Sequence, residues 1–132
     1  MTQEDKQLLL VDLSARLNTN LVCSIYRIDD YGVGYRDEIL TGYCKGDIWY
    51  EFYFGDDCGI GIDNVSKIKP YLFPLSSMTP KQKSELSMLT ADSERMFDSI
   101  LIEIDFYHKY HFDYRGLIPM GLANDATGLN IY

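Results

Sequence analysis

Near the start of the chain, apolar residues recur at steps of three and four positions, at Leu9, Leu10, Leu13 and Leu17. This spacing places apolar side chains on one face of an α-helix. Thr2 can cap such a helix, and the acidic residues that follow it favour the same start. The pattern therefore predicts a helix over residues 3–17, ended by the Asn-Thr-Asn turn at residues 18–20.

Beyond that turn the period of the pattern shortens to two, and β-branched and aromatic residues dominate, as is typical of half-buried strands. The alternation predicts strands at residues 21–28, 38–44, 48–54 and 60–62. The turn at residues 45–47 predicts a hairpin between the second and third of these strands. Four or five short antiparallel strands of this kind predict a small sheet or an SH3-like barrel.

Three of the four prolines fall within residues 67–80. We interpret this segment as an ordered, partly extended connector, because the residue before a proline avoids the helical conformation. Its last two residues, Thr79 and Pro80, suit the cap and the first position of a helix. We expect that helix to run to Leu89, with Leu86 and Leu89 turned inward.

A longer helix is predicted from residue 92 or 93 to about residue 110. It carries an apolar stripe at helical spacing, made of Phe97, Ile100, Leu101, Ile104 and Tyr107. The width of the stripe predicts that this helix lies across the sheet. Glycines recur in the tail, where only one helical turn is expected, at residues 118–123. The elements predict an α+β fold with one N-terminal and two C-terminal helices packed on the strands, in a single domain over residues 1–132.

The formal net charge of the chain is −8, and it is unevenly distributed. Residues 29–63 hold nine acidic residues against two basic ones. Binding to a nucleic acid backbone needs a Lys/Arg face, so no nucleic-acid partner is expected. The acidic side chains are either the solvated face of strands and turns, or a surface that mimics nucleic acid or docks on a basic partner. The candidate partner-binding residues are Asp29, Asp30, Asp37, Glu38, Asp47 and Glu51.

Sequence features also bear on the compartment. No apolar run approaches the ~20 residues that cross a bilayer, and the N-terminus lacks the basic start of a signal peptide. The three cysteines, Cys23, Cys44 and Cys58, have spacings that fit reduced structural thiols better than a disulfide framework. We therefore expect a cytoplasmic protein without a membrane partner.

The best candidates for metal ligands are His108 and His111, which are spaced by about one helical turn. Two ligands do not complete a site, and no Cys-x-x-Cys or His-Glu-x-x-His motif accompanies them. Alternatively, both histidines end a helix, where a positive charge is favourable. No motif for nucleophilic catalysis, for calcium or for nucleotide phosphates is present, so no cofactor is expected.

Three stretches, LLLVDLSARL (8–17), IKPYLFPLSSMT (68–79) and the segment 104–132 with its HFDYRGLI motif, together resemble a family of small uncharacterised proteins of anaerobic gut bacteria and their phages. The resemblance covers under half of the chain and brings no assigned activity or catalytic residue. It implies a phage or prophage context. It also implies that residues 69–72 and 113–116 belong to a shared frame, and that residues 29–63 are where such proteins differ.

These observations favour a non-enzymatic module whose acidic, tyrosine-rich face binds another protein, for example an inhibitor of a host protein. The charge segregation also suits self-association. A second hypothesis is a protein that binds an anionic small molecule or a nucleotide, with Tyr114 and Arg115 at the mouth of a pocket between the sheet and the last helix. A third is an enzyme with a metal at His108 and His111. Alternatively, Arg115 anchors the tail to the rest of the domain and does not bind a ligand.

Overall fold

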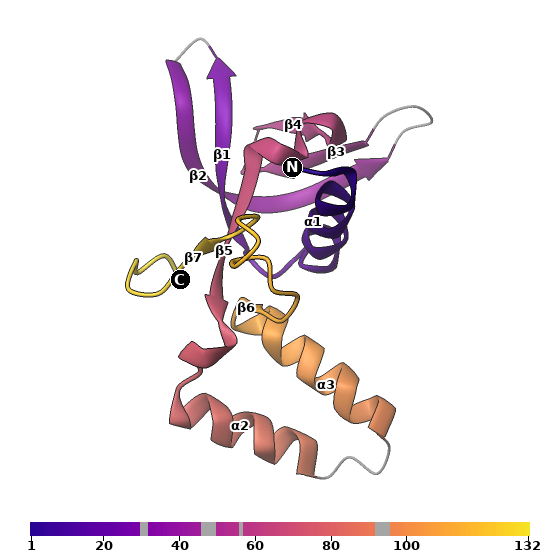
Figure 1. Cartoon of the computed structure of the whole chain (residues 1–132), viewed down its shortest axis with the longest axis vertical. Coiled ribbons are helices and arrows are strands. Elements are labelled where there is room, and N and C mark those ends of the chain that lie inside the picture. The colour runs from indigo at the N-terminus through magenta and orange to yellow at the C-terminus, as the bar shows by residue number, and fades with distance from the viewer. Residues whose placement is uncertain (30–31, 46–49, 56, 92–95) are drawn as a thin grey trace.

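The computed structural model describes residues 1–29, 32–45, 50–55, 57–91 and 96–132. Over these residues the chain forms an α+β fold, which confirms the predicted class (Figure 1). The helices are α1 (Gln3–Ala15), α2 (Pro80–Ala91) and α3 (Met96–Lys109), with short 3₁₀ turns η1 (Ile62–Lys67) and η2 (Leu75–Ser77). The strands are β1 (Val22–Asp29), β2 (Gly32–Lys45), β3 (Tyr50–Phe54), β4 (Asp57–Gly61), β5 (Ile68–Pro74), β6 (Phe112–Asp113) and β7 (Asn124–Asp125). None of the described helices has both the length and the apolarity to cross a membrane.

The strands follow the order β4-β3-β2-β1-β5-β6, and β7 also pairs with β5. Strands β1 to β4 form an antiparallel meander that includes the predicted hairpin between β2 and β3. The two short strands β6 and β7 run parallel to β5, so the sheet is mixed rather than purely antiparallel. It also has more strands than the four or five predicted, because the proline-containing connector and the tail both contribute to it.

β5 is the largest departure from the predicted strand arrangement. It lies within the segment interpreted as a connector, yet it pairs with β1 on one side and with the tail strands on the other. Its burial alternates, with Ile68, Pro70 and Leu72 buried, as expected for a strand with one core face. The prolines at 70 and 74 hid this period in the sequence, because proline is rare in a central strand.

α1 provides the main helical contribution to the core. Its start is the capping box of Thr2 and Asp5, in which each residue's side chain accepts a hydrogen bond from the other's backbone N–H. Leu9 and Leu13 are fully buried and pack in one cluster with side chains of the sheet. The predicted N-terminal helix is thus confirmed, and it ends two residues before the expected boundary.

The placement predicted for the last helix was wrong. α3 does not lie across the sheet: Figure 1 shows α2 and α3 as a helical hairpin that extends from the end of β5, away from the meander. Phe106 is the one residue of α3 that is buried. Leu89 of α2, expected to turn inward, is exposed, and Leu86 is half-buried. The physical reason is that α1 and the tail already supply the apolar side chains of the core.

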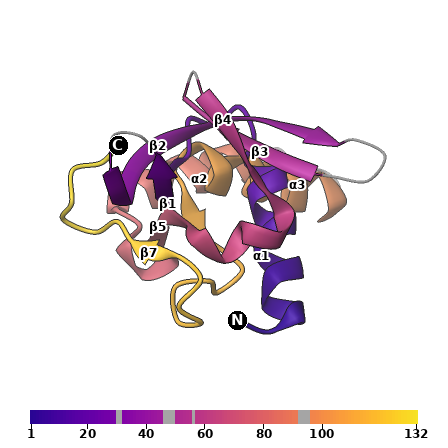
Figure 2. The same ribbon diagram turned by 90° about the horizontal axis from the view of Figure 1, so that it is seen from above.

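The tail, residues 111–132, passes around β5 (Figures 1 and 2). Leu117 and Leu122 belong to the main core cluster, which accounts for the apolar side chains that α3 does not provide. The helical turn expected at residues 118–123 is replaced by hydrogen-bonded turns, in which the backbone N–H of Leu122 donates to the carbonyl of Leu117 (2.9 Å). The tail is therefore an integral part of the core.

Candidate functional site

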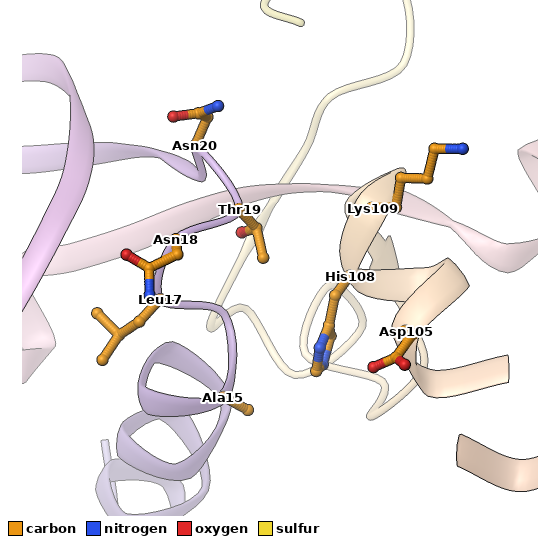
Figure 3. Close-up of a pocket in the computed structure, with 8 residues that line it drawn as sticks. All are labelled: Ala15, Leu17, Asn18, Thr19, Asn20, Asp105, His108 and Lys109. Carbon is orange, nitrogen blue, oxygen red and sulfur yellow. The ribbon is translucent and has the colours of Figure 1, made fainter. Parts of the chain in front are cut away.

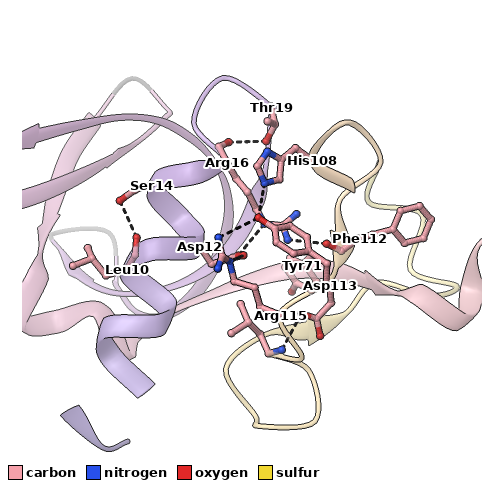
Figure 4. Close-up of polar contacts among 12 residues, drawn as sticks. Leu10, Asp12, Ser14, Arg16, Thr19, Tyr71, His108, Phe112, Asp113 and Arg115 are labelled. Carbon is pink, nitrogen blue, oxygen red and sulfur yellow. Dashed lines mark hydrogen bonds and ion pairs between the residues drawn. The ribbon is translucent and has the colours of Figure 1, made fainter. Parts of the chain in front are cut away.

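A buried ionic network joins α1 to the tail. Asp12 and Arg16 are both fully buried, and the Nε of Arg16 donates to Oδ2 of Asp12 over 2.8 Å (Figure 4). The Nη2 of Arg16 donates to the carbonyl of Phe112 (2.7 Å). Arg115 approaches the same carboxylate from the other side, with its Nε 3.2 Å from Oδ1 of Asp12. Two guanidinium groups therefore share one carboxylate, which connects residues about a hundred positions apart.

Tyr114 completes this network. The guanidinium carbons of Arg16 and Arg115 lie 5.2 and 5.0 Å from the centre of its ring, within the range of cation–π attraction. Its hydroxyl lies 2.7 Å from Nε2 of His108. Both residues that the small-molecule hypothesis placed at a pocket mouth, Tyr114 and Arg115, are thus engaged with the protein itself. Such contacts are expected if Arg115 anchors the tail to the rest of the domain.

The two histidines lie in different surroundings. His108 is half-buried beside Tyr114, whereas His111 is buried and stacks on the ring of Tyr132 at 3.7 Å between centres. Burial lowers the pKa of His111 to about 4, and the nearby positive charge of Arg16 acts in the same direction. Burial and Arg16 also lower the pKa of His108. At both positions, burial and the charge of Arg16 thus oppose the positive charge that is expected to be favourable at a helix end.

The metal hypothesis gains no support from the part of the chain that the structure describes. Among the described residues there is no group of three or more His, Cys, Asp and Glu side chains arranged to hold a metal ion. Of the cysteines, Cys23 is fully buried, and burial raises the pKa of its thiol. A buried, protonated thiol is a poor nucleophile and a poor metal ligand.

A polar cleft of about 580 Å³ opens between the end of α1 and the end of α3. It is lined by Ala15, Leu17, Asn18, Thr19, Asn20, Asp105, His108 and Lys109. Figure 3 shows His108 projecting from α3 into the space beside the end of α1. The amide, hydroxyl and imidazole groups that line the cleft can make hydrogen bonds. The charge of Lys109 is already paired with Glu85, 3.0 Å away.

The acidic partner-binding candidates that the structure describes, Asp37, Glu38 and Glu51, do not form one surface. Asp37 is exposed and accepts a hydrogen bond from Tyr71 (2.9 Å). Glu38, the next residue of β2, points to the opposite face and pairs with Arg27 at 2.7 Å. Glu51, on β3, accepts a hydrogen bond from its neighbour Tyr53. Asp30 and Asp47 lie outside the described residues, as does the side chain of Asp29.

The helical hairpin instead exposes an apolar surface. The side chains at Phe97, Leu101, Ile104 and His108 recur at steps of four, three and four residues along one face of α3, which we name the α3 seam. Phe97 is 67% and Leu101 is 47% exposed. Phe97, Leu101 and Ile104 belong to the apolar stripe that the sequence pattern assigns to the core, whereas His108 lies outside that stripe. Periodicity does not say what covers a face.

The α3 seam faces away from α2. Tyr110 and Lys109 reach α2 through Glu85, and Phe106 packs on Tyr110 with 4.9 Å between ring centres. At 3.6 residues per turn, Phe106 lies about half a turn around the helix from the α3 seam. The distal end of the hairpin adds further exposed apolar side chains, Met88, Leu89 and Met96.

A second exposed apolar surface lies on the β1–β2 ribbon. Ile28 pairs with Val33 across the two strands, and they are 70% and 66% exposed. Next to them, the rings of Tyr26 and Tyr35 pack edge to face at 5.1 Å. This patch combines apolar and tyrosine side chains, which are common in protein interfaces.

Comparisons of the chain with protein-family models, with characterised proteins and with solved structures found no match in any of the three. The resemblance to proteins of gut bacteria and their phages therefore stays a prediction.

Proposed function

We propose that the protein is a non-enzymatic interaction module that binds another protein through the α3 seam and the apolar end of the helical hairpin. The observation that carries the proposal is the exposure of Phe97 and Leu101 on one face of a well-formed helix. Contiguous apolar patches are uncommon on proteins that act alone and mark interaction sites. A helix face of this kind is a familiar element of peptide and helix recognition.

The α3 seam is held in place before any partner binds. Phe106 stacks on Phe112 of the tail, with an angle of 12° between the ring planes, and packs on Tyr110. Glu85 of α2 accepts from both the Lys109 Nζ and the Tyr110 hydroxyl. The buried network around Arg16 then ties the tail to α1. Such pre-organisation favours binding, because less conformational entropy is lost on association.

The direct test is site-specific photo-crosslinking in cells that naturally make the protein. A photoreactive amino acid at position 101 should give one discrete adduct with a second protein. The matched control is the same amino acid at Leu129, which is 52% exposed but lies in the tail. Equal adducts at both positions, or an adduct only at the control position, would contradict the proposal.

The proposal includes the setting that the resemblance implies, a phage or prophage protein, and an inhibitor of a host protein is its concrete version. A partner from the host, crosslinked at position 101, supports that version. A partner encoded beside the protein in the same phage genome would contradict it and indicate a phage assembly instead.

The polar cleft favours a second candidate, the binding of a small molecule through hydrogen bonds to the groups that line it. His108 and Lys109 line it together with the turn at residues 18–20. Melting curves with nucleotides, inorganic phosphate and zinc test this candidate, because a ligand that binds the folded state raises the melting temperature. A rise with phosphate or nucleotide that disappears in Lys109→Ala supports it, whereas a rise with zinc alone supports the metal hypothesis.

A further inference from the structure

The spacing of the side chains along the α3 seam indicates what kind of structural element can bind there. Steps of four, three and four residues are those of the core positions of a coiled coil, in which side chains at alternating a and d positions of a heptad meet a second helix. Phe97 and Ile104 occupy d positions, and Leu101 and His108 occupy a positions. An α-helix of the partner can pack along the part of this line formed by Phe97, Leu101 and Ile104, with its own apolar side chains inserted between them. At the other end of the line, His108 is half-buried against Tyr114.

The residues beside the α3 seam indicate which charge a bound helix should carry. Asp98 and Asp105 directly follow the two d positions, so both occupy position e of the heptad, and both are exposed. Charges at e and g positions set partner choice in coiled coils. A helix docked on the seam therefore places its own flanking residues beside two carboxylates. The residues that complement them are Lys and Arg.

A second copy of the chain does not meet this requirement. In an antiparallel pair of α3 helices, e positions face e positions, so Asp98 and Asp105 of one copy would lie opposite the same carboxylates of the other. In a parallel pair they would face Ile100 and Tyr107, the g positions, which offer no positive charge. Each copy also carries a net charge of −8, which opposes association.

From these observations we infer that the partner presents a basic amphipathic helix, with an apolar seam of its own and Lys or Arg beside it. The inference depends on the proposed function and names the chemistry of its partner. It also explains why an acidic chain places two of its exposed carboxylates on the rim of an apolar surface.

Two synthetic helical peptides of about three heptads test the inference. They share one Leu/Ile seam and differ only in carrying Lys or Glu at their e and g positions. Fluorescence anisotropy then gives their affinities for the full chain. We expect the Lys peptide to bind at least about tenfold more tightly than the Glu peptide, and Asp98→Lys/Asp105→Lys to reverse that order.

Two controls separate the α3 seam from general charge attraction. Glu4→Lys/Asp37→Lys makes the same change in net charge at exposed sites away from the seam, and it should leave the preference for the Lys peptide in place. Leu101→Asp should abolish binding of both peptides. Equal affinities of the two peptides, absence of binding, or loss of the preference in the control variant overturns the inference.

The outcomes also distinguish this inference from the proposed function. An adduct at position 101 together with no charge preference among the peptides overturns the basic helix and leaves the interaction module standing. No adduct at position 101 contradicts the interaction module itself. Sedimentation of the chain alone as a dimer that Leu101→Asp dissociates would make a second copy the occupant and overturn the inference.

Discussion

Asp12 and Arg16 lie one helical turn apart in α1 and form an ion pair of 2.8 Å in which neither side chain is exposed to solvent. Desolvation makes such a pair costly to bury, and it is tolerated only when further hydrogen bonds complete it. Here Arg115 and the carbonyl of Phe112 supply two of them. The pair thus fixes the position of the tail, and through β6, which follows α3, it fixes the end of the helical hairpin.

Replacement of the shared carboxylate should strongly destabilise the protein. Asp12→Ala leaves the buried guanidinium of Arg16 without its counter-charge, and we expect a loss of about 3–5 kcal/mol in the free energy of unfolding. Urea denaturation measures it. Asp105→Ala, which removes an exposed carboxylate, is the matched control and should change stability by less than about 0.5 kcal/mol. A loss below about 1 kcal/mol for Asp12→Ala would show that the network is not structural.

Arg115→Ala should have a smaller and more local effect. The side chain is 29% exposed, so its ion pair with Asp12 is partly screened, and we expect a loss of about 1 kcal/mol. Hydrogen exchange should quicken most in residues 117–132, because Arg115 connects the tail to α1. If exchange in the tail is unchanged while binding of an anionic ligand is lost, Arg115 belongs to a binding site instead.

The buried imidazole of His111 predicts a pH dependence of stability. Its pKa falls from 6.5 to about 4 on folding, so the unfolded chain takes up a proton at a higher pH than the folded one. Stability should therefore be constant above about pH 6.5 and fall between there and about pH 4, by roughly 2–3 kcal/mol. Denaturation midpoints measured across this pH range test whether stability falls as the pH falls.

The control for that prediction is His111→Asn. Asparagine tolerates the positive φ of 60° at this position, and it does not titrate in this range. The variant should lose most of the pH dependence. The remainder comes from the other groups whose pKa values are lowered on folding, which are His108, Asp5, Glu85 and Asp125. An unchanged slope would assign the pH dependence to other groups.

The exposure of the α3 seam makes a prediction opposite to the one that the sequence pattern suggests. Leu101→Ser should lower the free energy of unfolding by only about 1 kcal/mol, because the side chain is nearly half exposed and little burial energy is lost. Phe106→Ala, on the opposite face of the helix, should cost about 3–5 kcal/mol. Similar losses for the two variants would place α3 in the core after all.

Local patterns predicted the elements of this fold well. The capping box and leucine spacing of α1 and the hairpin between β2 and β3 depend on neighbouring residues, so the sequence alone displays them. β5 was interpreted as a connector because two prolines interrupt its strand pattern. Its place between β1 and the tail strands results from long-range pairing, which no local pattern contains.

The candidate site was less predictable. The apolar stripe of α3 is plain in the sequence. Whether other residues cover such a stripe depends on which segments pack in the core. The tail fills that place with Leu117 and Leu122. Likewise, Asp12 and Arg115 are ordinary charged residues until the fold brings them together. The motif that looked most like chemistry, around His108 and His111, is largely occupied with holding the tail.

We propose that the α3 seam, rather than the tyrosine-containing patch on the β1–β2 ribbon, is the binding surface. The most direct measurement uses the partner that is crosslinked at position 101. Calorimetry gives the affinity of that partner for two variants, each with a substitution at an exposed apolar residue. Leu101→Ser should weaken binding at least about tenfold, or about 1.4 kcal/mol, and Ile28→Ser should leave it unchanged. Wild-type affinity of Leu101→Ser combined with weakened binding of Ile28→Ser would contradict the claim.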